Sequence, residues 1–136
     1  MNRKQLRQLA DVRLDEATAL LKAGRSSGAY YLAGYAVECA LKACIARKTQ
    51  MHEFPILDRV KKSHVHDLRE LVGVAKLDRE PSLRLKAPSF KMNWDVVKDW
   101  KVEARYAKHS RKKAEDLIHA VSDSKDGVLT WLKARW

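Results

Sequence analysis

Residues 26–49, with the sequence SSGAYYLAGYAVECALKACIARKT, decide the fold of this chain. From Ala29 to Ala46 almost every side chain is apolar or small, and the only charged residues are Glu38 and Lys42. A helix that is apolar on all sides is a buried one, and this stretch is too long for a strand. We therefore expect a central helix that other helices cover on several sides, with a second subunit covering any side left open.

Helical periodicity predicts four further helices around the central one. We expect them over residues 3–23, over residues 63–76, after an N-cap at Asn93, and from Ser110 to the end of the chain. Gly24 lies where a left-handed residue ends the first helix, and Ser26 or Ser27 can supply the N-cap oxygen of the central helix. The segments predicted to be irregular are residues 50–62 and 78–92, and a fray or kink is expected at 123–127.

Length and composition exclude several classes of protein. The 136 residues are enough for one domain whose core needs no disulfide or metal, and a hydrophobic share of 46% excludes wholesale disorder. No apolar run approaches the ~18 residues of a membrane span, so no membrane partner is expected. The predicted architecture is all-α, an up-and-down bundle of four main helices plus a short fifth, forming one domain over residues 1–136.

The two cysteines say little about function. Cys39 and Cys44 are five residues apart on the central helix, which turns them about 140° away from each other, so they cannot form a disulfide with one another. Two buried thiols fit a reducing cytoplasm. The chain has no metal-binding spacing of Cys or His, and we expect neither a metal nor a cofactor.

A net charge of +11 raises the question of an anionic partner. Residues 105–113, RYAKHSRKK, hold five formal cations and a histidine without any acid. Their last three cations begin a predicted helix, where the dipole and the free N–H groups favour phosphate. The alternative interpretation is a solvated basic turn. The residues assigned to phosphate or nucleic-acid contact are Arg105, Tyr106, Lys108, Arg111, Lys112 and Lys113.

Aromatic side chains near this segment could stack on bases. Tyr106 is one of them, and Trp94 and Trp100 are two others, although core or interface positions explain these two tryptophans better.

Glu38 and a histidine cluster are the remaining candidates. A carboxylate inside an apolar helix needs a partner, so we expect Glu38 to be in a buried ion pair, with Arg105 as the partner, rather than to act as a catalytic acid. His64, His66 and Asp67 are interpreted as the opening of a helix, with Asp67 helping its first turn, in preference to metal binding or acid–base chemistry.

Three stretches together resemble a known family. They are AYYLAGYAVECALKACIARK at 29–48, HDLREL at 66–71 and EARY at 103–106, followed by a final helix. The chain resembles the small stand-alone bacterial HEPN-domain proteins over nearly its whole length. This resemblance implies a bundle of four or five helices, a homodimer, binding of RNA or a nucleotide, and a nucleotidyltransferase partner in a toxin–antitoxin pair.

The same resemblance implies where catalysis would lie. Catalytic members are metal-independent ribonucleases with an Arg, a polar residue, and a His after four to six intervening residues. Here Arg105 and His109 have only three residues between them, and Tyr106 stands at the polar position. We therefore expect a dimeric nucleotide- or RNA-binding module without catalysis. The alternatives are a ribonuclease toxin that uses Arg105 and His109 with support from Glu38, and a pure interaction module for an acidic partner.

Overall fold

The computed structural model describes residues 1–49, 61–80 and 88–136, and within these ranges the chain is all-α, as predicted. The described elements are α1 (Arg3–Lys22), α2 (Ser26–Lys48), α4 (Leu68–Val74), the 3-10 helix η1 (Leu77–Arg79), α6 (Pro88–Val97), the 3-10 helix η2 (Val102–Tyr106), α7 (Arg111–Ser122) and α8 (Val128–Lys133).

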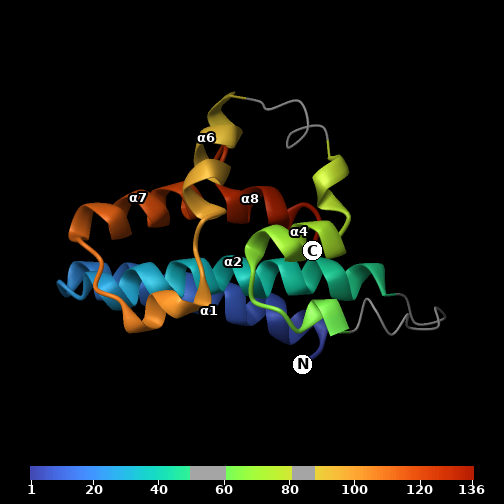
Figure 1. Ribbon diagram of the computed structural model, residues 1–136, viewed down its shortest axis with the longest axis horizontal. Coiled ribbons are helices and arrows are strands. Elements are labelled where there is room, and N and C mark those ends of the chain that lie inside the picture. The colour runs from blue at the N-terminus through green and yellow to red at the C-terminus, as the bar shows by residue number, and fades with distance from the viewer. Residues whose placement is uncertain (50–60, 81–87) are drawn as a thin grey trace.

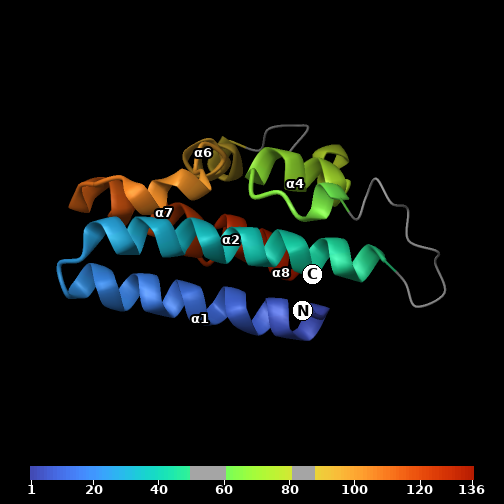
Figure 2. The ribbon, with the colours of Figure 1, turned by 60° about the horizontal axis from the view of Figure 1, so that its bottom comes forward.

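Helix α2 is the central helix that its sequence predicts. In Figure 2 it lies between α1 on one side and α4 and α6 on the other, and Figure 1 shows α7 and α8 running along it. Its buried residues come from all around the helix, from Ala29 to Ile45. The two ends of the chain meet near one end of this bundle, where the Arg3 guanidinium donates to the main-chain carbonyl of Trp136.

The turn between α1 and α2 confirms one prediction and corrects another. Gly24 ends the first helix in the left-handed region at φ +77°, as expected. However, neither Ser26 nor Ser27 caps α2, because the N-cap position is Arg25 and no side chain bonds there. Both serine hydroxyls instead bind the main chain of His109, which lies next to the start of α7.

Two predicted helix starts were wrong. The third helix begins at Leu68 rather than residue 63, because the Asp67 carboxylate caps it by accepting from the N–H groups of Arg69 and Glu70. The fourth helix begins at Pro88, so Asn93 lies inside α6, and its side-chain amide donates to the Asp126 carbonyl at 2.9 Å.

The two predicted irregular segments have different outcomes. In the predicted irregular segment 78–92, residues 78–79 belong to η1 and residues 88–92 to α6, whereas residues 81–87 lie outside the described ranges. Of the predicted irregular segment 50–62, residues 50–60 lie outside the described ranges, and residues 61–62 are helical instead of irregular.

The last helix starts and breaks where the sequence indicates. Ser110 caps α7 through its hydroxyl, which accepts from the Lys113 N–H at 3.2 Å. The helix stops at Ser122 and resumes as α8 at Val128, so the expected kink is a full break. Across that break, the Thr130 hydroxyl of α8 donates to the Asp123 carbonyl at 2.7 Å, and the Gly127 N–H donates to the same oxygen at 3.0 Å.

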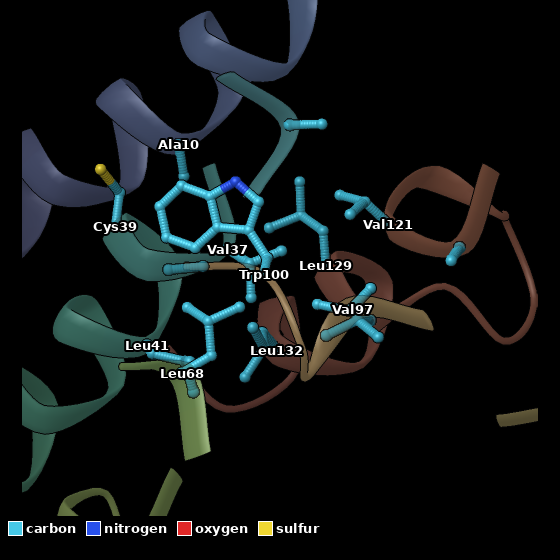
Figure 3. Packing of buried hydrophobic residues seen from close by; sticks show 14 of the residues in the cluster. Ala10, Val37, Cys39, Leu41, Leu68, Val97, Trp100, Val121, Leu129 and Leu132 are labelled. Atoms are coloured by element: carbon cyan, nitrogen blue, oxygen red, sulfur yellow. The ribbon is translucent and has the colours of Figure 1, made fainter. Parts of the chain in front are cut away.

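Trp100 fills the centre of the core (Figure 3), packed among residues of α1, α2, α6 and α8. Its ring lies directly over Gly34 of α2, where a Cβ atom would come within 2.2 Å of the indole. Trp100 is therefore a core residue and cannot stack on a base, while Trp94 is half-buried. Because Trp100 lies two residues before η2, this packing fixes where the chain between α6 and α7 crosses α2.

Cys39 and Cys44 are both buried free thiols, and burial raises the pKa of each to about 11. None of the helices described here is long and apolar enough to span a membrane.

Candidate functional site

The basic segment 105–113 lies at the end of the bundle where the α1–α2 turn meets the start of α7 (Figure 1). The Arg111 guanidinium reaches the Leu21 carbonyl at 3.5 Å, which joins α7 to the end of α1. The exposed Lys22 and Arg25 belong to the same end of the molecule, and sequence reasoning did not include them. Nothing local in the sequence signals this, because their position depends on how the α1–α2 hairpin packs against α7.

Arg105 and Lys108 are the most available cations of the segment. Both are exposed, and neither forms an ion pair with any other described residue. The Arg105 guanidinium lies over the Tyr106 ring at 4.7 Å from its centroid, and this ring is 78% exposed. A cation and an open aromatic face side by side can bind a phosphate and stack on a base.

The other three cations of the segment already have partners. Arg111 pairs with Glu115 at 2.7 Å and Lys112 with Asp116 at 3.2 Å, each along the first turns of α7. These pairs are exposed, so each contributes at most about 1 kcal/mol and can be exchanged for a phosphate. Lys113 lies over the Tyr30 ring at 5.1 Å.

His109 is built into the scaffold. Its N–H donates to the Ser27 hydroxyl at 2.9 Å, and its carbonyl accepts from the Ser26 hydroxyl at 2.7 Å. Its ring stacks on Tyr30 with centroids 3.9 Å apart. Its Nε2 donates to the Ala104 carbonyl at 3.3 Å, and its Nδ1 is buried without a partner among the described residues. Neither ring nitrogen is therefore free to meet a ligand.

Glu38 has different partners from the predicted one. Its side chain is buried in the core, and its Oε1 accepts from Lys42 Nζ at 3.0 Å and from His66 Nδ1 at 2.8 Å. Arg105 is exposed and lies over Tyr106 instead, so the expected Glu38–Arg105 pair was wrong. The second oxygen, Oε2, is buried and has no hydrogen-bond partner within the described ranges.

His66 is a candidate that the sequence assigned to the opening of a helix, without indicating its contact with Glu38. It stands in the chain just before α4, with its side chain 53% exposed and its Nδ1 held by Glu38. It lines a hollow of about 360 Å³ together with Val65, Asp67, Lys101, Val102 and Glu103. The sequence shows that Glu38 needs a partner, but it does not show that the start of α4 packs beside the middle of α2.

Asp67 connects the two segments that line this hollow, residues 65–67 and residues 101–103. Its carboxylate accepts from Lys101 Nζ at 3.2 Å while it also caps α4. Partial burial works to raise the pKa of this carboxyl, but the N–H groups of Glu70 and Arg69 and the charge of Lys101 outweigh it, so the pKa lies below its usual value. Among the described residues, no three side chains converge in a way that could hold a metal ion.

Comparison with known protein families identifies the family of this chain. The model of the HEPN domain matches residues 4–133. The chain belongs to the HEPN family. HEPN domains are modules related to nucleotides and RNA, they occur often in toxin systems, and they commonly dimerise. No curated protein and no solved structure matches this chain.

Proposed function

We propose that this HEPN protein binds RNA or a nucleotide through the basic surface made by Arg105, Tyr106 and Lys108 together with Lys22 and Arg25. The observation that carries the proposal is the pair of exposed cations on either side of an exposed tyrosine, neither of which has an acidic partner in the described ranges. Arg111, Lys112 and Lys113 add positive charge at the start of α7, where the helix dipole also favours an anion.

Binding is favoured over cleavage at this surface because of the position of His109. A general acid or base must reach the reacting group with a free ring nitrogen. The ring of His109 is stacked on Tyr30, and its two nitrogens face the Ala104 carbonyl and the protein interior. The ribonuclease alternative with Arg105 and His109 therefore has less support than binding alone.

We propose further that the whole chain acts as one module in the cytoplasm, as a homodimer beside a nucleotidyltransferase in a toxin–antitoxin pair. The support for this part is membership of the HEPN family. Light scattering of the purified chain tests the dimer, and co-purification with a nucleotidyltransferase encoded beside its gene tests the pairing. A monomer at micromolar concentration, or separate elution of the two proteins, would contradict the respective part.

The binding proposal is tested with a fluorescently labelled single-stranded RNA at increasing salt. The expected affinity falls steeply with salt, and each phosphate contact contributes about 0.7 to the slope of log K against log salt. The double variant Arg105→Ala/Lys108→Ala should weaken binding about tenfold and reduce that slope. The matched control Lys4→Ala/Lys48→Ala removes the same charge from the other end of the bundle and should leave the affinity within twofold. Binding that is absent, independent of salt, or equally weakened by both double variants would contradict the proposal.

A further inference from the structure

We propose that the hollow beside His66 binds the nucleoside part of a ribonucleotide, and that His66 Nε2 contacts it. This inference rests on the proposed function, because it assigns the sugar and base of the ligand whose phosphate contacts Arg105. The hollow and the basic surface are neighbours in the chain as well as in space. Val102 and Glu103, at the start of η2, line the hollow, and Arg105 and Tyr106 end the same short helix.

The Glu38 carboxylate provides the first argument. Burying a carboxylate with one oxygen unpaired costs free energy, and an apolar residue at this point of α2 would pack without that cost. The carboxylate holds the imidazole ring of His66 in one orientation. Its Oε1 accepts from His66 Nδ1 at 2.8 Å, which sets the tautomer and the ring orientation. Carboxylates hold histidines in this way in binding and catalytic sites generally.

The second argument is His66 Nε2, the ring nitrogen that does not contact Glu38. With Nδ1 occupied by Glu38, His66 Nε2 has no hydrogen-bond partner among the described residues, and the side chain is about half exposed where it lines the hollow. In the neutral ring, Nε2 is then an acceptor whose orientation the protein has already fixed. Such a nitrogen is suited to accept from a hydroxyl or an amine of a ligand.

The lining of the hollow fits a nucleoside. Val65 and Val102 provide apolar walls, and Glu103 is an exposed carboxylate without an ion pair in the described part of the chain. Carboxylates accept hydrogen bonds from ribose hydroxyls in nucleotide sites. A volume of about 360 Å³ is at the lower end of the range of small-ligand pockets.

The distance along η2 agrees with a single nucleotide unit. A 3-10 helix rises about 2 Å per residue, so Val102 and Arg105 are roughly 6 Å apart along its axis. A ribose in the hollow can therefore have its phosphate at Arg105, and the next base of a strand can stack on Tyr106.

The test compares RNA with DNA. Fluorescence anisotropy measures the affinities of wild type, His66→Asn, Glu103→Gln and Arg105→Ala for a labelled single-stranded RNA and for DNA of the same sequence. Asparagine places an amide nitrogen close to the position of Nδ1, so His66→Asn keeps a donor toward Glu38 and removes only Nε2. We expect His66→Asn to weaken RNA binding about tenfold and DNA binding less than threefold. Glu103→Gln should weaken RNA binding about threefold, and Arg105→Ala should weaken RNA and DNA binding equally.

The outcomes separate the two proposals. If Arg105→Ala weakens binding but His66→Asn and Glu103→Gln leave the RNA and DNA affinities within twofold of wild type, the nucleoside site is overturned and the basic surface stands. If wild type binds neither RNA nor DNA, the proposed function fails, and the nucleoside site fails with it. Thermal unfolding of each variant checks the fold. If His66→Asn is unfolded, Glu103→Gln decides, because the Glu103 side chain is exposed and forms no ion pair with another described residue.

Discussion

His109 and His66 belong to two neighbouring parts of the molecule, and they differ in whether a ring nitrogen is accessible to a ligand. His109 stands in the most basic segment of the chain, yet its main chain is bound by two serines and its ring lies against Tyr30. His66 stands before α4, away from the basic segment in sequence, yet a buried carboxylate holds one of its nitrogens and its side chain lines a hollow. The comparison teaches that a histidine is available for function through what its two nitrogens contact, and not through the charge of its neighbours in sequence.

The largest expected effect comes from the frame that both histidines share. Gly34→Ala places a Cβ atom within 2.2 Å of the Trp100 indole, and Trp100 fixes the chain that leads to the hollow and then to His109. We expect a loss of about 3 kcal/mol in the free energy of unfolding, measured by urea denaturation. The control is Gly73→Ala in α4, where a Cβ atom meets nothing within 4 Å, and it should be neutral or stabilising. Equal stabilities of the two variants would contradict this account of the core.

His109→Ala tests whether His109 stabilises the fold without contacting the ligand. It removes the stack on Tyr30 and the bond to the Ala104 carbonyl, so we expect a loss of about 2 kcal/mol in unfolding free energy. The RNA affinity of the folded variant should remain within twofold of wild type. His119→Ala, on the exposed side of α7, is the matched control and should change stability by less than about 0.5 kcal/mol. A tenfold loss of RNA affinity at unchanged stability would assign His109 to the binding site.

Glu38→Met tests whether the Glu38 carboxylate orients His66 for RNA binding. Methionine fits an apolar environment at similar volume, and the freed Lys42 and His66 side chains both reach water. The unfolding free energy should stay the same or rise by about 1 kcal/mol, while RNA binding weakens about tenfold because His66 loses its fixed orientation. The two measurements are urea denaturation and fluorescence anisotropy. A loss of stability above about 2 kcal/mol with unchanged RNA affinity would make the Glu38–His66 bond a structural tie only.

The smallest effect concerns Asp67, which caps α4 beside His66. Asp67→Ala removes the cap and should cost about 1 kcal/mol, whereas Asp67→Asn keeps a capping oxygen and should cost only a few tenths. The pKa of Asp67 in the folded protein lies below its unfolded value. Its charge therefore stabilises the fold above the unfolded pKa, and this contribution is lost as the pH falls through the folded pKa. If wild type and Asp67→Asn lost stability identically between pH 5 and pH 2, this contribution would be absent.

Much of the fold could be predicted from the sequence because its signals are local. The apolar composition of residues 29–46 marks a buried helix wherever it packs, and Gly24 and Ser110 act within one turn of their own position. The errors about helix caps at Asn93, Ser26 and Ser27 arose because a residue distant in sequence binds the side chain. Asn93 reads as a cap but bonds to Asp126, and Ser26 and Ser27 read as caps but bind His109.

The candidate site was less predictable for the same reason. The need of Glu38 for a partner follows from its apolar surroundings, but the choice among 28 Lys and Arg and five His does not. The chain places His66 there because α4 packs on α2, and it takes Arg105 elsewhere because η2 turns that side chain outward over Tyr106. Basic composition drew attention to residues 105–113 and to His109, whose ring nitrogens are enclosed by the fold, whereas the histidine with an exposed side chain beside a hollow is His66.

The most direct test observes the two imidazole rings in one spectrum. Ring nitrogens are recorded by ¹H–¹⁵N NMR of the ¹⁵N-labelled protein, assigned with His66→Asn and His109→Ala, while a short single-stranded RNA is added. The expected result is a saturable change in the chemical shift of His66 Nε2 with increasing RNA, while the chemical shifts of both His109 ring nitrogens remain unchanged. A spectrum in which the His109 resonances respond to RNA and His66 Nε2 does not would contradict the central claim that His66 is the histidine this protein offers to its ligand.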